Sequence, residues 1–158
     1  MSIAQQSEMV AATGKSFPLS ASNTTVSLSI EAPTGPALQA QAAGKARQAY
    51  LRLEKITGSG MPVGYEVYLH SPNESDPQQH EELCAGLLPL FGLEKASKPG
   101  RGHAGTGLHY VYKVTDLIAK LEHQTGWNPK DLRVTFVPRR QQTRAAEVKI
   151  GRVSLYYE

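Results

Sequence analysis

Tyr65-Glu66-Val67-Tyr68-Leu69-His70 is the stretch that decides the fold class, because its side chains alternate in character. Successive side chains of a strand point to opposite faces, so Tyr65, Val67 and Leu69 would share one face of a strand. The same period of two recurs at 26–30, 50–56, 108–114, 132–136 and 148–157. About seven strands at such close spacing predict a mainly β protein, an antiparallel β-sandwich that is jelly-roll-like or immunoglobulin-like.

One short α-helix is predicted near 115–124. Thr115 can serve as its N-cap, and Gly126 can end it in a left-handed conformation. Apolar residues recur at helical spacing across this segment, at Val114, Leu117, Ile118 and Leu121. One face of the helix is therefore expected to pack on the sandwich.

The chain divides at its first strand. Residues 1–22 mix Ser, Ala, Gln, Thr and Gly without a period, which predicts a flexible linker or tail. Residues 23–158 would form the β-sandwich domain. Within that domain, 83–93 is apolar at both parities, as in a strand covered on both faces, and 71–82 is expected to be a polar loop. The parity changes at Gly151-Arg152, which predicts a β-bulge there.

Charge and composition exclude several classes of protein. The chain has 17 basic and 14 acidic residues, a net charge of +3, and the basic residues are scattered, so no nucleic-acid partner is expected. No run of apolar residues could cross a membrane, and the first ten residues lack the features of a secretory signal. The expected location is therefore the cytoplasm, with no membrane partner. A single cysteine, Cys84, permits no intrachain disulfide.

No catalytic motif is complete. Residues 100–105 spell G-x-G-x-x-G, but a predicted strand follows them where phosphate binding requires a helix. Cys84 lies in an apolar run, where a thiol behaves as a small hydrophobic group. No serine lies in a G-x-S-x-G elbow. The residues thus predict no enzyme activity for this chain on its own.

Metal binding has only weak candidates. The chain has five histidines, and none of them forms the H-x-x-x-H pair that places two ligands on one helix face. His80 and Cys84, four residues apart, would suit a soft cation such as Cu(I). The alternative interpretation is that His80 is an ordinary surface histidine.

Several blocks of the chain resemble a known family. The segments concerned are 64–69, the apolar run 83–91, Thr115-Asp116-Leu117, 132–139 with its Val-Pro-Arg ending, and 151–158. In this order they resemble the C-terminal domain of polyphenol oxidases and bacterial tyrosinases. The resemblance covers about residues 23–158, and it implies that residues 8–22 are the linker from a tyrosinase catalytic domain.

The resemblance implies a role for the chain. Tyrosinases are type-3 copper oxidoreductases of melanin formation whose two coppers are held by six histidines on a helical bundle, and this chain has five histidines and one predicted helix. The expected cofactor is therefore a dicopper centre in a partner catalytic domain, with none bound by this chain. In the family, the C-terminal domain covers the copper site, keeps the enzyme latent, and assists folding or copper loading.

Shielding requires a large apolar side chain at the tip of a loop. Met61, between Gly60 and Pro62, is one candidate, and Phe91, at the end of the apolar run, is the other. The alternative is that Met61 caps one end of the sandwich and that Phe91 belongs to the core. Two further alternatives remain: a free binding module that uses the Gly-rich loops 57–64 and 98–107, or part of an assembled tyrosinase that shares its activity.

Overall fold

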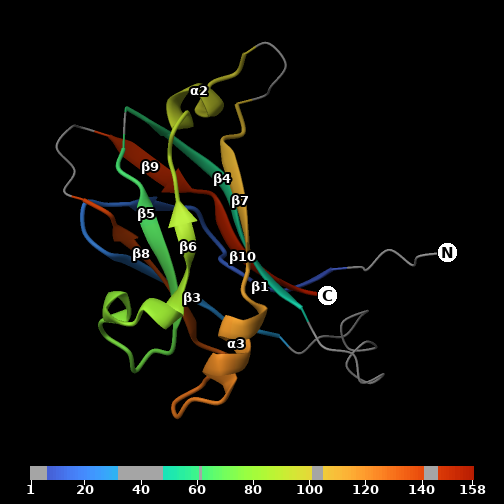
Figure 1. Cartoon of the computed structure of the whole chain (residues 1–158). Helices are drawn as coiled ribbons and strands as arrows, with labels where there is room; N and C mark the ends of the chain where they lie inside the picture. Colours follow the sequence, from blue (N-terminus) through green and yellow to red (C-terminus); the bar gives the residue numbers. More distant parts are fainter. Residues whose placement is uncertain (1–6, 32–47, 61, 101–104, 141–145) are drawn as a thin grey trace.

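The alternating segments form two antiparallel sheets that pack on each other (Figure 1). The computed structural model describes residues 7–31, 48–60, 62–100, 105–140 and 146–158. The first sheet has the order β1 (Glu8–Ala12), β10 (Arg152–Tyr157), β4 (Ala49–Ser59), β9 (Glu147–Ile150), β2 (Phe17–Leu19), and β7 (Leu108–Lys113) also pairs with β4. The second has the order β3 (Thr24–Leu28), β8 (Leu132–Pro138), β5 (Tyr65–His70), β6 (Cys84–Leu88). The predicted antiparallel sandwich is confirmed, with ten strands in the described residues where about seven were expected.

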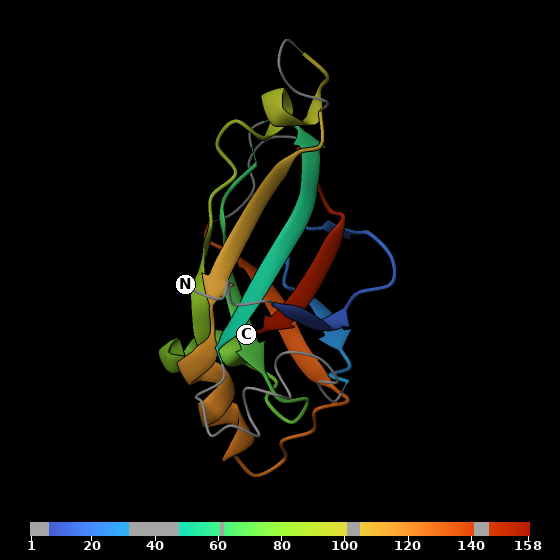
Figure 2. The same ribbon diagram turned by 90° about the vertical axis from the view of Figure 1, so that its right-hand side faces the viewer.

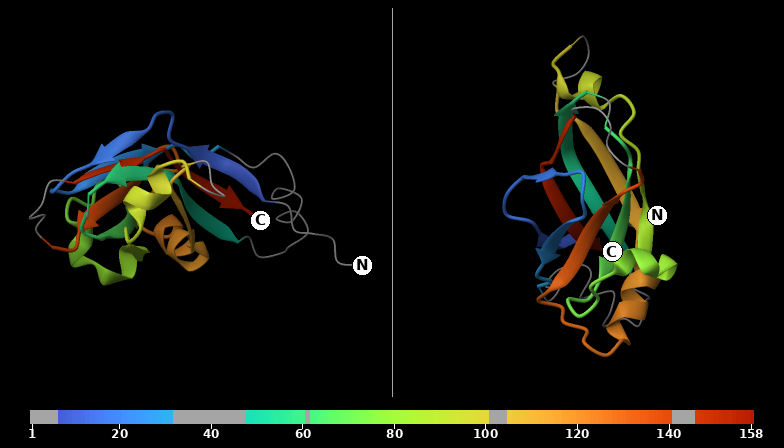
Figure 3. Two further views of the ribbon diagram at one scale, coloured as in Figure 1. Left: turned by 90° about the horizontal axis from the view of Figure 1, so that it is seen from above. Right: turned by 90° about the vertical axis from the view of Figure 1, so that its left-hand side faces the viewer.

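The strand β4 organises the first sheet. Its 11 residues pair with β10, β9 and β7. Figure 2 shows β4 and β7 running side by side along the length of the molecule. Seen from above, the N-terminal strands lie along one side and α3 lies on the opposite side (Figure 3). Leu51 and Leu53 of β4 are fully buried between the sheets, as their parity predicts.

The predicted change of parity is found at Gly151, between β9 and β10. The Gly151 N–H donates to the carbonyl oxygens of Glu54 and Lys55, and Lys55 has a positive φ of 54°. Both strands pair with β4, so this irregularity keeps apolar residues of opposite parity in the core. Those buried residues are Val148, Ile150, Val153, Leu155 and Tyr157.

Helix α3 (Thr115–Glu122) confirms the predicted helix, and its buried side chains are Ile118 and Leu121. The prediction for its start is wrong, because Val114 is the N-cap and no side chain caps the helix. The Thr115 hydroxyl instead accepts a hydrogen bond from the Ala49 N–H at 3.0 Å, which ties the helix to β4. None of the described helices is long and apolar enough to span a membrane.

The prediction of a linker over 1–22 is wrong for the part that forms β1 and β2. β1 pairs with β10, and β2 pairs with β9. The register of β1 against β10 shifts between Met9 and Ala11, and the neighbouring residues Val10 and Ala11 are both buried as a result. Buried and exposed side chains therefore do not alternate along β1, and the sequence shows no period of two there. The sandwich therefore includes strands well before residue 23.

The prediction of one covered strand over 83–93 is also wrong. β6 ends at Leu88 and is the edge strand of the second sheet. Beyond it, the chain turns at Phe91-Gly92 and enters a second helix, α2 (Leu93–Ser97). The expected loop 71–82 contains two short 3-10 segments, η1 (Pro77–Gln79) and η2, which spans Glu81–Leu83.

Two tyrosines join the free edges of the two sheets. The Tyr112 hydroxyl on β7 donates to the Leu87 carbonyl of β6 at 2.7 Å, and the Tyr110 hydroxyl donates to the Pro89 carbonyl at 2.8 Å. The Tyr112 ring lies directly against Gly86, where a Cβ would be 2.7 Å from a ring carbon. A residue without a side chain is therefore required at position 86 for this contact between the sheets.

Gly86→Ala is expected to lower the free energy of unfolding by about 1–3 kcal/mol, because the new methyl group would displace the Tyr112 ring. Chemical denaturation measures this change. Gly14→Ala is the matched control, since a Cβ at Gly14 meets nothing within 4 Å, and its effect should stay within about 0.5 kcal/mol. Equal effects of the two substitutions would contradict the contact.

Candidate functional site

Phe91 stands out because 97% of its surface is exposed. It lies in the turn between β6 and α2, where the Leu93 N–H donates to the Leu90 carbonyl at 3.2 Å. Leu90 and Leu93 on either side are buried, and Gly92 adopts a left-handed φ of 79°. The two leucines anchor the turn, so Phe91 is presented outward and the core alternative for this residue is wrong.

The helix α2 is held in place by the strands beside it. The Ser97 hydroxyl donates to the Leu93 carbonyl at 2.7 Å and accepts from the Gly58 N–H at 2.8 Å. The Gly107 N–H donates to the Ala96 carbonyl at 3.0 Å. The turn that carries Phe91 therefore rests on a helix fixed to both β4 and the start of β7.

The other exposed apolar side chains are divided between the two sheets, and Met9, opposite Tyr156 on β10, lies on the same face of the first sheet as Val111. Leu87 is opposite Glu66 on the outer face of the second sheet, whereas Val111 is opposite Arg52 on the outer face of the first. Met61, the other shielding candidate, lies outside the described residues, as do residues 101–104 of the Gly-rich loop 98–107.

The metal candidates His80 and Cys84 have separate partners. His80 Nε2 lies 3.1 Å from a Glu74 carboxylate oxygen, and its Nδ1 lies 3.5 Å from a Glu82 oxygen. The Cys84 thiol donates to the Gly86 carbonyl at 3.6 Å, and burial raises the pKa of this thiol, which disfavours the thiolate that metals bind. The described residues include no group of three or more His, Cys, Asp or Glu that could hold a metal ion, so they do not fit a dicopper centre.

His70 is the polar residue whose burial the strand pattern did not predict. Alternation puts it on the outer face of β5, yet only 3% of it is exposed. Its Nδ1 lies 2.9 Å from the Ser71 carbonyl, which can only accept, so Nδ1 carries the proton. Its Nε2 then accepts from the Thr135 hydroxyl at 2.6 Å, and Thr135 accepts from Thr25 at 2.8 Å. Burial lowers the pKa of His70, which favours this neutral form.

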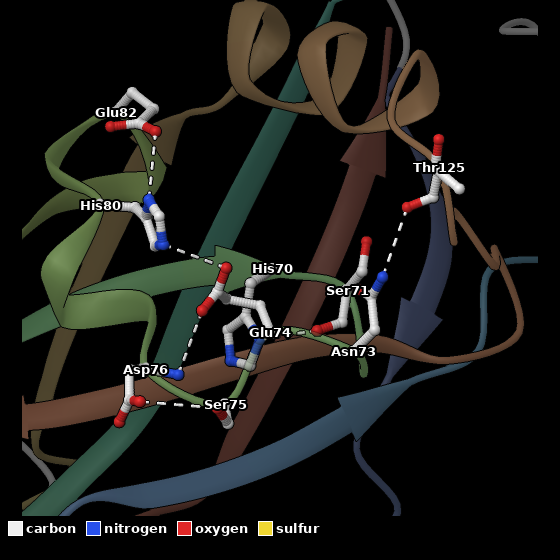
Figure 4. Close-up of polar contacts among 9 residues, drawn as sticks. All are labelled: His70, Ser71, Asn73, Glu74, Ser75, Asp76, His80, Glu82 and Thr125. Atoms are coloured by element: carbon white, nitrogen blue, oxygen red, sulfur yellow. Dashed lines mark hydrogen bonds and ion pairs between the residues drawn. The ribbon is translucent and has the colours of Figure 1, made fainter.

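A polar cavity of about 380 Å³ adjoins His70 (Figure 4). It lies between the segment that follows β5 and the residues that follow α3, and it is lined by Ser71, Glu74, His80 and Thr125 among others. Figure 4 shows His80 between the carboxylates of Glu74 and Glu82. Periodicity gave no signal of this cavity, because its wall is formed by turns distant in sequence.

Acidification is expected to destabilise the chain through His70. The unfolded chain binds a proton near the ordinary pKa of 6.5, while the folded pKa is lower. The contribution of neutral His70 to the free energy of unfolding is therefore fully present above pH 6.5. It is lost as the pH falls below 6.5 toward the lower pKa of the folded state. We expect Tm to fall between about pH 7.5 and about pH 5.5, and to fall less in His70→Gln. In His123→Gln, where an exposed histidine is replaced, the fall should match the wild type; identical profiles for all three proteins would contradict the assignment.

The chain matches known proteins in sequence and in fold. Residues 6–158 match the family model described as "Domain of unknown function (DUF7868)". The tyrosinase HcTyr1 of Hahella sp. (strain CCB-MM4) is 32% identical over 124 residues, which are 78% of this chain and 26% of that protein.

Among solved structures, a latent aurone synthase, a polyphenol oxidase, matches with a TM-score of 0.51 at 13% identity, over 89% of this chain and 25% of that one. Latent apple tyrosinase matches with a TM-score of 0.46 at 18% identity, over 92% and 26%. The chain thus spans about a quarter of the length of these proteins, and the aurone synthase match shows a shared fold. Because the family model covers nearly the whole sequence, the chain belongs to the family described as "Domain of unknown function (DUF7868)", and a tyrosinase is among its relatives.

Proposed function

We propose that this chain is a non-catalytic domain that packs on a tyrosinase catalytic domain, covers its dicopper site and keeps the enzyme latent. The observation that carries the proposal is the 32% identity to a tyrosinase of which the match covers only 26%. A segment of that size leaves most of the tyrosinase for a separate catalytic part. The aurone synthase whose fold matches is named as latent, which agrees with this role.

Phe91 is the residue proposed to enter the copper site. A phenol ring is the group that a tyrosinase accepts, and a phenylalanine ring has the same shape without a hydroxyl to oxidise. Its exposure in the free chain leaves apolar area that burial in a partner would remove from water, worth about 1.5–3 kcal/mol for a phenylalanine side chain. Leu90 and Leu93 hold the turn in the conformation that projects the ring.

Assistance with folding or copper loading is the second part of the proposal. A cover over the site would protect its apolar entrance from aggregation until the copper ions are bound. The described residues of this chain hold no group suited to a metal, so any assistance is expected to act by shielding the catalytic domain.

The test is a titration of this chain into the catalytic domain of the Hahella tyrosinase, prepared without the segment that this chain matches. The oxidation of a catechol is followed. We expect a saturable loss of rate that protease treatment reverses. If the rate is unchanged at high micromolar chain and also in a covalent fusion of the two parts, the proposal is wrong.

Copper loading is measured separately, from the copper content of the catalytic domain expressed with and without this chain. Equal copper content in both preparations would remove this part of the proposal and leave latency untouched.

A further inference from the structure

The exposed side chains between Leu87 and Phe91 are all apolar. Burial alternates along this stretch: Leu88 and Leu90 are buried, whereas Leu87, Pro89 and Phe91 are exposed. Leu87 is 49% exposed and Phe91 is 97% exposed, so two of the four large apolar side chains that are exposed in the described part of the chain lie here. We call the three outward residues, Leu87, Pro89 and Phe91, the β6 ridge.

The neighbouring strands carry polar residues at their exposed positions. On β7 these positions are His109, Val111 and Lys113, and on β3 they are Thr25 and Ser27. The β6 ridge differs, because three successive outward positions leave apolar area in water. A row of this kind along an edge strand is typical of a surface that a partner covers.

Two tyrosine hydroxyls close the edge of β6 that faces away from β5. β6 pairs with β5 along one edge, and β7 lies beside the other (Figure 1). The hydroxyls of Tyr112 and Tyr110 on β7 occupy the carbonyls of Leu87 and Pro89. An added strand would pair with these same carbonyls, so the two hydroxyls disfavour backbone pairing with another chain. A partner of the β6 ridge therefore has to contact its side chains.

Charged side chains border the β6 ridge. Glu66 on β5 lies directly opposite Leu87. Near the other end, Gly64 separates the exposed Arg139 from the backbone of the ridge, since a Cβ at Gly64 would lie 3.7 Å from Arg139 Cδ and 3.2 Å from the Leu88 carbonyl oxygen. An apolar centre with a polar rim is the usual composition of a protein–protein interface.

We propose that the β6 ridge is the surface on which this chain docks to a tyrosinase catalytic domain, with Leu87 and Pro89 seated in an apolar groove beside the pocket that receives Phe91. The inference rests on the proposed function and adds to it the surface where the two domains meet. The ridge ends at Phe91, the residue proposed to enter the copper site, so both contacts belong to one continuous surface. The match to the Hahella tyrosinase leaves most of that protein outside it, and this remainder is the occupant.

The first experiment measures affinity, so that docking is separated from inhibition. The Hahella catalytic domain, prepared as above and shown to be folded by its own oxidation of a catechol, is titrated with this chain by calorimetry. Leu87→Glu would place a charge against the apolar groove and should weaken binding by about thirtyfold or more.

Val111→Glu is the matched control, because it introduces the same charge at an exposed position on the outer face of the first sheet. Its affinity should stay within about twofold of the wild type. Both substituted positions are exposed, so both variants should keep the wild-type Tm within a few degrees.

The outcomes separate the β6 ridge from the proposed function. If the wild type binds and inhibits and Leu87→Glu binds equally well, the ridge is wrong and latency stands. If the wild type neither binds nor inhibits, in trans or in the covalent fusion, both proposals are wrong. Binding without inhibition, lost in Leu87→Glu and kept in Val111→Glu, would support the ridge and remove latency.

Methyl NMR gives a second readout with its control inside the same molecule. A soluble gadolinium chelate broadens the resonances of exposed methyl groups, and those of Leu87 and Val111 are exposed in the free chain. In the complex with the catalytic domain, the Leu87 methyl groups should be protected and the Val111 methyl groups should stay broadened. Unchanged broadening at Leu87 in a saturated complex would contradict the docking surface.

Sedimentation of the free chain tests a second copy as the occupant. We expect a monomer at the concentrations of the titration, because the Tyr110 and Tyr112 hydroxyls close the edge of β6. A dimer that dissociates in Leu87→Glu and persists in Val111→Glu would assign the β6 ridge to a second copy of this chain and overturn the proposal.

Discussion

Phe91→Ala is expected to weaken inhibition of the catalytic domain by about thirtyfold or more, without loss of stability. The side chain is 97% exposed, so its removal leaves no cavity in the free chain, while the proposed complex would lose its central apolar contact. The inhibition constant for catechol oxidation is the quantity to measure, together with Tm, which should stay within a few degrees of the wild type.

Val111→Ala is the matched control, because it also shortens an exposed apolar side chain, one that is 60% exposed on the outer face of the first sheet. Inhibition by this variant should equal that of the wild type. If Phe91→Ala inhibits as well as the wild type, Phe91 is not the residue that enters the copper site, and Met61→Gly becomes the variant to measure.

Val134→Asp is expected to unfold the chain. Val134 is fully buried on β8, between Val26 of β3 and Leu69 of β5. An aspartate there would bring a charge or an unpaired carboxyl into the core at a cost of several kcal/mol, comparable with the 5–15 kcal/mol that stabilises a typical domain. Circular dichroism and the dispersion of the NMR spectrum should both show loss of the native state.

The same substitution at an exposed strand position controls for the low strand propensity of aspartate. Val111→Asp on β7 should cost about 1 kcal/mol or less and leave a cooperative thermal transition. A cooperative transition in Val134→Asp, within a few degrees of the wild type, would show that this residue does not face the core.

Strands whose side chains alternate in character were predictable from the sequence, and β4, β7 and β8 are of this kind. β1 and β2 were not, because the register shift after Met9 removes the alternation from one and the other has only three residues. The helix α2 has five residues, too few to be stable alone, and its position depends on the contact between Ser97 and Gly58. The positions of β1, β2 and α2 are determined by strand pairing and tertiary contacts, and these contacts cannot be inferred from the local sequence.

The candidate site was predictable in part. The apolar run 83–93 indicated Phe91 as a candidate, but it did not show that Phe91 projects from a turn. That projection requires Leu90 and Leu93 to be buried, and their burial depends on the packing around α2. His70 was placed on the outer face by its parity, which is correct for the strand. The residues that follow β5 contribute to its burial, and burial lowers its pKa and favours the neutral form that Thr135 hydrogen-bonds; neither effect is visible in the alternation.

The pairing of β1 and β4 with β10 has a consequence for synthesis on the ribosome. β10 is the last of the described strands, and it pairs on one side with β1, the first of them, and on the other with β4. Until β10 has left the exit tunnel, β1 has no partner, and β4 has β7 along one edge but lacks β10 along the other. The unpaired edges of β1 and β4 are then open to other nascent chains. The first sheet is therefore completed only after β10 has been synthesised, and chaperones that bind exposed strands have their longest opportunity to act on β1 and β4 before that point.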